Sequence, residues 1–309
     1  MSESRKIGII GGDKRQLVTA SCLCADFECA IWGFAAVYGT PDEKYLRNTV
    51  RCTDWESAVK CSDALVLPLP VTRDSGSADL LTLNAPLAYP GEGSVVHLTD
   101  VCDALPRGAF LLGGMIPPSL KRYAAERGLG VFDYYDSEEL QIKNAVPTAE
   151  GAIAACMDTL PITIDGMRAA VFGYGRVGRT LAQKLLSLGS EVFAVARSAR
   201  DLAWAGCDGC IPMPLQEYKE LPVRCDAVFN TVPQRVFDSH LLSMLPKDSV
   251  IFELSTQNAG TDLTAAAEFG IKVVPLPSLP GKTAPVTAGE IICGVIRNAL
   301  IENAEGRRF

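Results

Sequence analysis

Short apolar runs recur along the whole chain, separated by polar turns that carry glycine or proline, and stretches with helical spacing lie between several of them. Alternation of this kind predicts parallel β-strands with helices on both faces of a sheet. At 309 residues the chain has the length of two domains. The sequence therefore predicts an α/β protein with two Rossmann-like, doubly wound parallel sheets. The strands are expected at 6–10, 29–34, 64–69, 95–98, 109–112 and 130–132, and then at 169–172, 192–195, 209–213, 227–230, 250–254 and 272–276.

The stretch that begins NAVPTAEG at Asn144 predicts a helix that runs to about Thr159 and links the two domains. Thr148 suits its N-cap and Glu150 its first turn, where a carboxylate interacts favourably with the helix dipole. Residues 72–93, rich in Ser, Gly, Pro and Asp, predict an irregular surface loop. The expected boundaries are a first domain at 1–145, a linking helix at 146–161, a second domain at 162–285 and a C-terminal helix at 286–309.

The motif GYGRVG at residues 173–178 carries the strongest functional signal, because it lies between an apolar strand and a helical stretch, with a second strand following. Gly173 suits the tight turn, Gly175 lets the backbone approach a pyrophosphate, and Gly178 allows close contact of helix and strand. The phosphates would lie at the helix N-terminus, beside Arg176 and Val177. Glycines that serve packing alone are the alternative.

The end of the second strand of this unit indicates which dinucleotide is bound. A unit specific for NAD usually places Asp or Glu there, about 20 residues after the glycines. Here the strand ends in Ala196-Arg197-Ser198. A guanidinium and a hydroxyl, with no carboxylate to repel it, favour a 2′-phosphate and so predict NADP(H). The alternative is that Arg197 is an ordinary surface charge.

Two further strand ends are expected to flank the cofactor, because the carboxyl ends of the strands face it in this fold. Thr231-Val232-Pro233 follows the strand at 227–230, and Ser255 follows the strand at 250–254. Ordinary turns are the alternative. In the first domain, Arg15 and Gln16 begin a helix after a glycine turn whose spacing does not fit the dinucleotide pattern. They either point into a cleft or face solvent.

The overall charge and the rare residue types exclude several classes of protein. A net charge of −7 and a pI near 5.0 disfavour nucleic acid and anionic membranes as partners. No apolar run reaches the roughly 18 residues of a membrane span, and a cytoplasmic protein is expected. The 11 scattered cysteines suit a reducing compartment and do not have the spacing of a metal site. His97 and His240 are poorly placed for the histidine base of a hydroxyacid dehydrogenase.

Several motifs together resemble the family of the A subunit of dipicolinate synthase, over nearly the whole chain. This resemblance implies an N-terminal Rossmann-like domain that carries substrate, an NADP-binding domain, and a layout similar to the formate/glycerate dehydrogenases, in which the last helix returns to the first domain. The motifs are GGDKRQ (11–16), NAVPTAEG (144–151), GYGRVGRT (173–180), VARS (195–198), NTVP (230–233), GTDL (260–263) and LPGKTAPVTAG (279–289).

The activity implied by the resemblance is the NADP-dependent oxidation of dihydrodipicolinate, from the lysine pathway, to the dipicolinate of endospores. A flavoprotein, the B subunit of dipicolinate synthase, would accompany this chain in the mother cell of a sporulating bacterium. The substrate's two carboxylates call for cations or backbone N–H donors, and the candidates are Arg15, Arg176, Lys282 and the helix start after Pro285. Gln16, Asn144, Thr148 and Glu150 are further substrate-binding candidates, and no catalytic residue is identified.

Two other functions stay open at this point. The chain could be a non-catalytic NADP(H)-binding protein that scaffolds or regulates its flavoprotein partner. It could also be an NADP-dependent dehydrogenase of another carboxylated metabolite, similar to shikimate dehydrogenase. Neither a metal nor a nucleic-acid partner is expected, and a homo-oligomer is possible.

Overall fold

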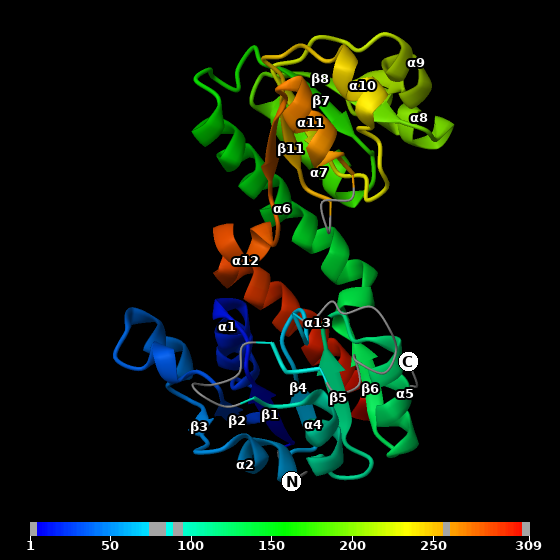
Figure 1. The fold of residues 1–309 in the computed structure, drawn as a ribbon. Coiled ribbons are helices and arrows are strands. Elements are labelled where there is room, and N and C mark those ends of the chain that lie inside the picture. Colours follow the sequence, from blue (N-terminus) through cyan, green and yellow to red (C-terminus); the bar gives the residue numbers. More distant parts are fainter. Residues whose placement is uncertain (1–4, 74–84, 89–94, 256–259, 305–309) are drawn as a thin grey trace. The chain divides into compact units, whose positions relative to one another are not determined.

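The computed structural model describes residues 5–73, 85–88, 95–255 and 260–304. The chain divides into two compact units: unit 1 comprises Met1–Gln141 with Pro285–Phe309, and unit 2 comprises Ile142–Ala284. Each unit contains a six-stranded sheet in which every pairing is parallel (Figure 1). The predicted α/β class with two Rossmann-like sheets is confirmed.

The sheet of unit 1 has the strand order β3-β2-β1-β4-β5-β6. The order reverses between β1 and β4, and in open α/β sheets the crevice at such a reversal, at the carboxyl ends of the strands, is the usual place for a ligand. The strands are β1 (Lys6–Ile10), β2 (Glu28–Trp32), β3 (Val50–Arg51), β4 (Ala64–Val66), β5 (Phe110–Gly113) and β6 (Gly130–Asp133).

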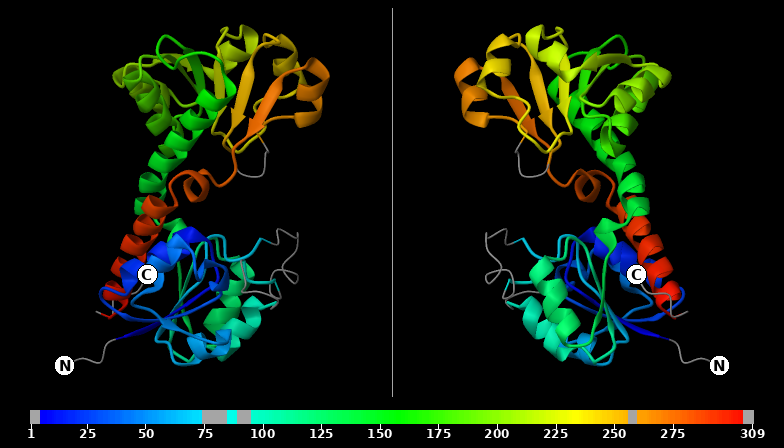
Figure 2. Two further views of the ribbon diagram at one scale, coloured as in Figure 1. Left: turned by 90° about the vertical axis from the view of Figure 1, so that its left-hand side faces the viewer. Right: turned by 90° about the vertical axis from the view of Figure 1, so that its right-hand side faces the viewer.

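Helices cover both faces of the unit 1 sheet (Figure 2). Buried residues of α1 (Lys14–Leu23) and α13 (Pro285–Ala304) pack on one face. The other face is covered by α2 (Trp55–Lys60), α4 (Leu98–Ala104) and α5 (Pro118–Glu126). The short helices η1 (Ala35–Val37), η2 (Pro41–Leu46) and η3 (Tyr134–Asp136) complete the described part of the unit.

Two contacts explain how closely α13 packs on α1. The Thr19 hydroxyl lies 3.0 Å from the Gly289 carbonyl oxygen, to which it donates. A Cβ at Gly289 would lie 2.5 Å from the Arg15 carbonyl oxygen, so the close approach of the two helices needs glycine there. The C-terminal helix is thus part of unit 1 in packing as well as in the division of the chain.

The sheet of unit 2 has the order β12-β11-β10-β7-β8-β9, with the reversal between β7 and β10. Buried residues of α6 and α7 pack on one face, and those of α9, α10 and α11 pack on the other. The strands are β7 (Arg168–Phe172), β8 (Glu191–Ala196), β9 (Ile211–Pro214), β10 (Ala227–Asn230), β11 (Val250–Glu253) and β12 (Lys272–Pro275). The helices are α6 (Glu138–Thr159), of which residues 138–141 belong to unit 1, and α7 (Arg176–Ser187), α8 (Ala199–Cys207), α9 (Leu215–Glu220), α10 (Ser239–Met244), α11 (Leu263–Phe269) and α12 (Leu279–Thr283).

The predicted start of the linking helix is wrong. The helix α6 begins at Glu138, so Thr148 and Glu150 lie in its interior and neither caps it. Pro147 lies within the helix as well. The two glutamates at 138 and 139 are the acidic residues of the true first turn, where they suit the helix dipole.

Two other expectations need correction or restriction. Residues 95–98 form no strand: Pro86 and His97 make an isolated bridge, and α4 begins at Leu98. The strand expected at 209–213 lies at Ile211–Pro214. Of the loop predicted at 72–93, only residues 72–73 and 85–88 belong to the described part of the chain, and the rest lies outside it.

Candidate functional site

The turn between β7 and α7 is shaped by its first glycine. Gly173 has a φ of +87°, a conformation that L-residues with a side chain rarely adopt. A Cβ at Gly173 would also lie 2.6 Å from the Thr231 hydroxyl oxygen. That hydroxyl donates to the Phe172 carbonyl oxygen at 2.7 Å and so holds the end of β10 against the turn. The turn therefore requires glycine at 173, for backbone conformation and for space.

The other two glycines of the motif differ from each other in their surroundings. Gly175 is the N-cap of α7 with ordinary extended angles, and no described atom lies within 4 Å of its Cβ direction. No side chain caps the helix there. At Gly178, by contrast, a Cβ would overlap the Gly173 carbonyl oxygen. Gly178 thus serves helix–strand packing, whereas Gly175 leaves open space in front of a helix N-terminus that can bind an anion.

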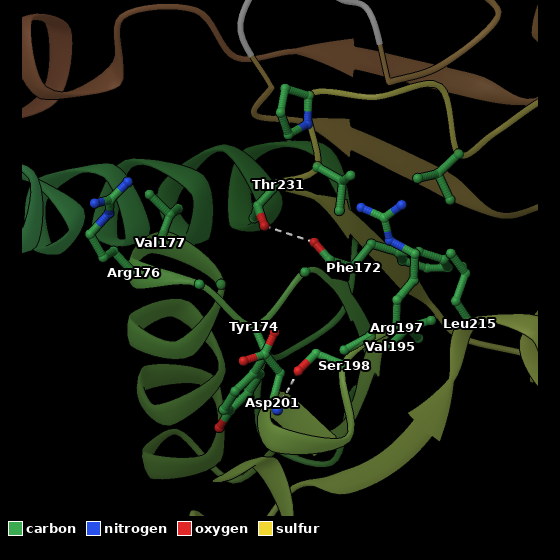
Figure 3. Close-up of a pocket in the computed structure, with 17 residues that line it drawn as sticks. Phe172, Tyr174, Arg176, Val177, Val195, Arg197, Ser198, Asp201, Leu215 and Thr231 are labelled. Atoms are coloured by element: carbon green, nitrogen blue, oxygen red, sulfur yellow. Dashed lines mark hydrogen bonds between the residues drawn. The ribbon is translucent and has the colours of Figure 1, made fainter. Parts of the chain in front are cut away.

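A cavity of about 380 Å³ opens at this turn, and we call it the glycine-turn cavity (Figure 3). It lies at the carboxyl ends of β7, β8 and β10, where the fold usually holds a nucleotide. Ten more residues that the sequence predicts as cofactor contacts line it along with Gly173; they are Gly175, Arg176, Val177, Gly178, Ala196, Arg197, Ser198, Thr231, Val232 and Pro233.

Ser255 is the one predicted cofactor contact that does not line the glycine-turn cavity. Its side chain is buried, and its backbone N–H donates to the Glu253 carboxylate at 3.0 Å. Within the described part of the chain, its hydroxyl has no hydrogen-bond partner.

Sequence reasoning missed several residues that line the glycine-turn cavity. Leu215 begins α9 and Val236 follows the β10 turn, so both reach the cavity from segments distant in sequence from the motif. Asp201 could have been found, because it stands three residues after the helix-capping Ser198. The missed residues are Phe172, Tyr174, Val195, Asp201, Leu215 and Val236.

The end of β8 presents a cation at the cavity. Arg197 is exposed, and its guanidinium donates to the Gln234 side-chain oxygen at 2.8 Å. Ser198 caps α8 by accepting a hydrogen bond from the Asp201 backbone N–H at 3.4 Å. The Asp201 carboxylate lies 3.3 Å from Arg200. The guanidinium of Arg197 is thus within reach of an anion at this end, and its present partner is a neutral amide that an anion can replace.

Tyr174 is held by groups behind the cavity. Its hydroxyl donates to the Asp208 carboxylate at 3.0 Å, and Arg179 binds the same carboxylate at 2.7 Å. The guanidinium of Arg179 holds the pKa of Asp208 below its ordinary value, and burial raises the pKa of Tyr174. The ring is therefore an anchor for the first turn of α7 and is not poised to exchange a proton near neutral pH.

Arg15 and Gln16, the two substrate candidates of unit 1, are buried, with exposed fractions of 8% and 2%. The alternative that they face solvent is therefore wrong. Arg15 binds the Asp13 carboxylate at 2.7 Å and the Leu69 carbonyl oxygen at 2.6 Å. The amide of Gln16 donates to the Val66 carbonyl oxygen at 3.3 Å. Both side chains lie near the carboxyl ends of β1 and β4, where the strand order of this sheet reverses.

The remaining substrate candidates belong to unit 2 and do not line the glycine-turn cavity. Thr148 donates to the Asn144 carbonyl oxygen at 2.7 Å, a bond within α6. Glu150 forms a partly exposed ion pair with Lys184 at 2.8 Å. Lys282 is exposed in the last turn of α12. The geometry does not gather these four residues at one described pocket.

No group of three or more His, Cys, Asp or Glu side chains within the described ranges could hold a metal ion. No helix found there is both long enough and apolar enough to cross a membrane.

The fold and the glycine turn define the class of protein, a two-unit α/β protein of the Rossmann type. The structure of a transhydrogenase from Sinorhizobium meliloti has this fold, with a TM-score of 0.68 and 14% identity over 95% of this chain and 93% of that chain.

More similar proteins show the particular family. The A subunit of dipicolinate synthase from Bacillus subtilis (strain 168) is 30% identical over 298 residues, 96% of both chains. The crystal structure of the corresponding dipicolinate synthase protein from Bacillus halodurans superposes with a TM-score of 0.84, at 26% identity over 96% of this chain and 97% of that chain. The family described as the N-terminal domain of the A subunit of dipicolinate synthase matches residues 6–135. The chain belongs to the family of dipicolinate synthase A subunits, as its motifs predict.

Proposed function

We propose that unit 2 binds NADP(H) in the glycine-turn cavity. The observation that carries this proposal is Gly175, which leaves open space directly in front of the uncapped N-terminus of α7. A pyrophosphate fits there, because helix N-terminal N–H groups bind anions and no side chain competes for them. Arg197 and Ser198 would hold the 2′-phosphate at the end of β8.

The reaction proposed is the oxidation of dihydrodipicolinate to dipicolinate. The ring loses one hydride and one proton, NADP⁺ becomes NADPH, and the ring becomes aromatic, which supplies much of the driving force. When bound, the nicotinamide supplies the hydride acceptor. The protein's task is then to hold and orient the reactants, which suits a chain in which no histidine stands at a described strand end of unit 2.

The substrate is proposed to bind unit 1 through its carboxylates, near Arg15 and Gln16. Family membership and the burial of both side chains at the carboxyl ends of β1 and β4 support this position. Asn144, Thr148, Glu150 and Lys282 stay as further predicted contacts. A flavoprotein, the B subunit, is proposed as partner, since the relatives are named as one of the subunits of a synthase and so point to a second chain.

The proposed activity is tested by following dipicolinate absorbance with the purified chain, freshly generated dihydrodipicolinate and NADP⁺. We expect product to form at a rate that depends on NADP⁺, with or without the flavoprotein added. Product formation that needs the flavoprotein and ignores NADP⁺ would favour the alternative of a non-catalytic scaffold. Turnover of another carboxylated metabolite in place of dihydrodipicolinate would favour the second alternative.

Exchanging Arg197 for aspartate is expected to weaken NADPH binding by about 10- to 100-fold, because a charge-assisted hydrogen bond is replaced by repulsion. NADH binding should weaken far less or improve. Fluorescence titration with each nucleotide measures both constants. Arg224→Asp is the matched control, since that exposed arginine pairs with Asp248 away from the cavity lining. An unchanged preference for NADPH in Arg197→Asp would mean that Arg197 is an ordinary surface charge.

A further inference from the structure

Glu253, at the end of β11, is a buried carboxylate that the proposed chemistry does not use. Glu253 is 1% exposed, and its carboxylate accepts hydrogen bonds from three described residues. The Asn230 amide nitrogen lies 3.0 Å from both carboxylate oxygens, the Ser255 backbone N–H donates to one of them at 3.0 Å, and the Thr261 hydroxyl donates to the other at 2.6 Å. A fully buried carboxylate with a complete set of donors is costly to change and specifies one local arrangement.

Glu253 and Val232 together determine which way the Asn230 amide faces. The Asn230 NH₂ group donates to the Glu253 carboxylate at 3.0 Å and to the Val232 carbonyl oxygen at 3.4 Å, and the Asn230 side-chain oxygen accepts the Val232 backbone N–H at 3.1 Å. If the amide turned over, its NH₂ group would meet the Val232 N–H, and two buried donors would face each other. Val232 lines the glycine-turn cavity, whereas Asn230 and Glu253 lie behind it.

The same network also holds the far end of the segment 231–237, which contributes residues to the lining of the glycine-turn cavity. The Gly260 carbonyl oxygen accepts the backbone N–H groups of Val236 and Phe237 at 2.9 and 3.0 Å. Gly260 stands next to Thr261, the hydroxyl donor to Glu253, and a Cβ there would overlap the Asn230 amide nitrogen. The segment 231–237, which supplies one wall of the cavity, is thus bonded at one end to Asn230, a donor to the carboxylate, and at the other end to Gly260, the residue before the donor Thr261.

We propose that Glu253 is a positioning residue for the glycine-turn cavity: by fixing the orientation of Asn230 and the place of residues 260–261, it holds the wall 231–237 in the conformation that binds the cofactor. The identity of that cofactor rests on the function proposed above, whereas the mechanical role of Glu253 does not. Glu253 does not line the cavity, and it acts through Asn230 and Thr261.

Glu253→Gln tests this role with almost no change of volume. Whichever way the new amide turns, its NH₂ group faces the Asn230 NH₂ group, because Asn230 contacts both positions at 3.0 Å. We expect backbone amides of 231–237 in the cofactor-free protein to exchange hydrogen at least about tenfold faster, while β7 and β8 keep their protection. NADPH affinity, measured by fluorescence titration, should fall about tenfold or more.

The double variant Asn230→Asp/Glu253→Gln is expected to restore the slow hydrogen exchange and the NADPH affinity that Glu253→Gln loses. The new amide at position 253 can donate to the new carboxylate at position 230, which still accepts the Val232 N–H, so a donor again faces an acceptor between the two side chains, and the charge moves from position 253 to position 230. Slow exchange and NADPH affinity should both return to within about threefold of wild type, a difference of less than 1 kcal/mol. Glu191→Gln is the matched control, since that exposed carboxylate pairs with Arg168 at the amino end of β8.

The outcomes separate this inference from the proposed function. If wild type binds neither NADPH nor NADH, the proposed function fails, and the exchange measurement still decides the role of Glu253. If Glu253→Gln exchanges and binds as wild type does, the inference is overturned. Should Glu253→Gln not fold, the double variant decides: a folded, slowly exchanging double variant supports the inference, and one that fails to regain wild-type exchange overturns it.

Discussion

Replacing Gly175 by alanine is expected to abolish dinucleotide binding while leaving unit 2 folded. The residue has φ −81° and ψ −162°, which alanine adopts easily, and no described atom lies within 4 Å of the added Cβ. The methyl group would fill the space through which a pyrophosphate must approach the start of α7. We expect the Kd for NADPH to rise at least about 100-fold, with a loss of only about 1 kcal/mol in stability from the poorer N-cap.

The neighbouring substitution Gly178→Ala should behave differently, and this contrast makes the experiment informative. Its Cβ would overlap the Gly173 carbonyl oxygen, so α7 must move away from the turn. Overpacking of this kind is expected to cost about 3 kcal/mol in the free energy of unfolding. Both variants should lose NADPH binding in fluorescence titrations, but only Gly178→Ala should lower the urea midpoint strongly.

A third glycine serves as the control for this pair. Gly206 lies inside α8, and the nearest described atom to its added Cβ is a Pro212 side-chain carbon at 3.4 Å, an ordinary contact. Gly206→Ala should keep NADPH affinity and gain a few tenths of a kcal/mol from better helix propensity. If Gly175→Ala binds NADPH as tightly as wild type, the phosphates do not lie on this turn, and the proposed cofactor site is wrong.

The glycine turn was predictable because its determinants are local. Gly173, Gly175 and Gly178 stand within six residues, and the backbone geometry that each one permits follows from its position in a strand–turn–helix unit. Arg197 and Ser198 were found in the same way, from the position at which β8 ends. Residues placed by one supersecondary unit can be assigned from sequence, since no distant contact is needed to bring them together.

The cavity wall and the network behind it could not be predicted in this way. Glu253, Asn230 and Thr261 meet only because β10 and β11 are neighbours in the sheet and residues 260–261 return against them. In sequence these are ordinary polar residues at the ends of apolar runs. Ser255 was assigned to the cofactor from its strand-end position, but the structure places its backbone on Glu253 instead of at the cavity.

The error at α6 has a local cause. Thr148 and Glu150 have the residue types of a helix start, but the helix already runs from Glu138 and continues through Pro147. Ala145, Ala149 and Ala152 are all fully buried. The burial of this helix face outweighs the loss of the backbone hydrogen bond that proline cannot donate. The tertiary contacts that decide this are absent from a local pattern.

Replacing Arg15 by methionine is expected to lower the free energy of unfolding of unit 1 by about 2–3 kcal/mol. The guanidinium is 8% exposed and holds both the Asp13 carboxylate and the Leu69 carbonyl oxygen. Removing one partner of a buried ion pair leaves the other without its counter-charge, which costs about 3–5 kcal/mol when both are dry. The side chain of Asp13 is 29% exposed, so water offsets part of that cost.

The double variant Asp13→Asn/Arg15→Met separates the structural role of Arg15 from substrate binding. Asparagine caps a helix as well as aspartate does, so the cap that Asp13 provides to α1 is kept and the unpaired carboxylate is removed. Stability, measured by urea unfolding, should therefore return to within about 1–2 kcal/mol of wild type, the remainder being the Leu69 carbonyl oxygen that has lost its buried donor. Arg47→Met, at an exposed position after η2, is the control for loss of a surface cation.

Steady-state kinetics of the same double variant then decide what Arg15 does for the substrate. If the guanidinium binds a substrate carboxylate, KM for dihydrodipicolinate should stay raised by about tenfold or more even though stability has returned, because a methionine cannot donate to the carboxylate. If KM returns together with stability, Arg15 only shapes the carboxyl ends of β1 and β4, and the substrate's carboxylates bind elsewhere. The two roles of Arg15 are thus separable, because the structural role depends on Asp13 and the proposed substrate-binding role does not.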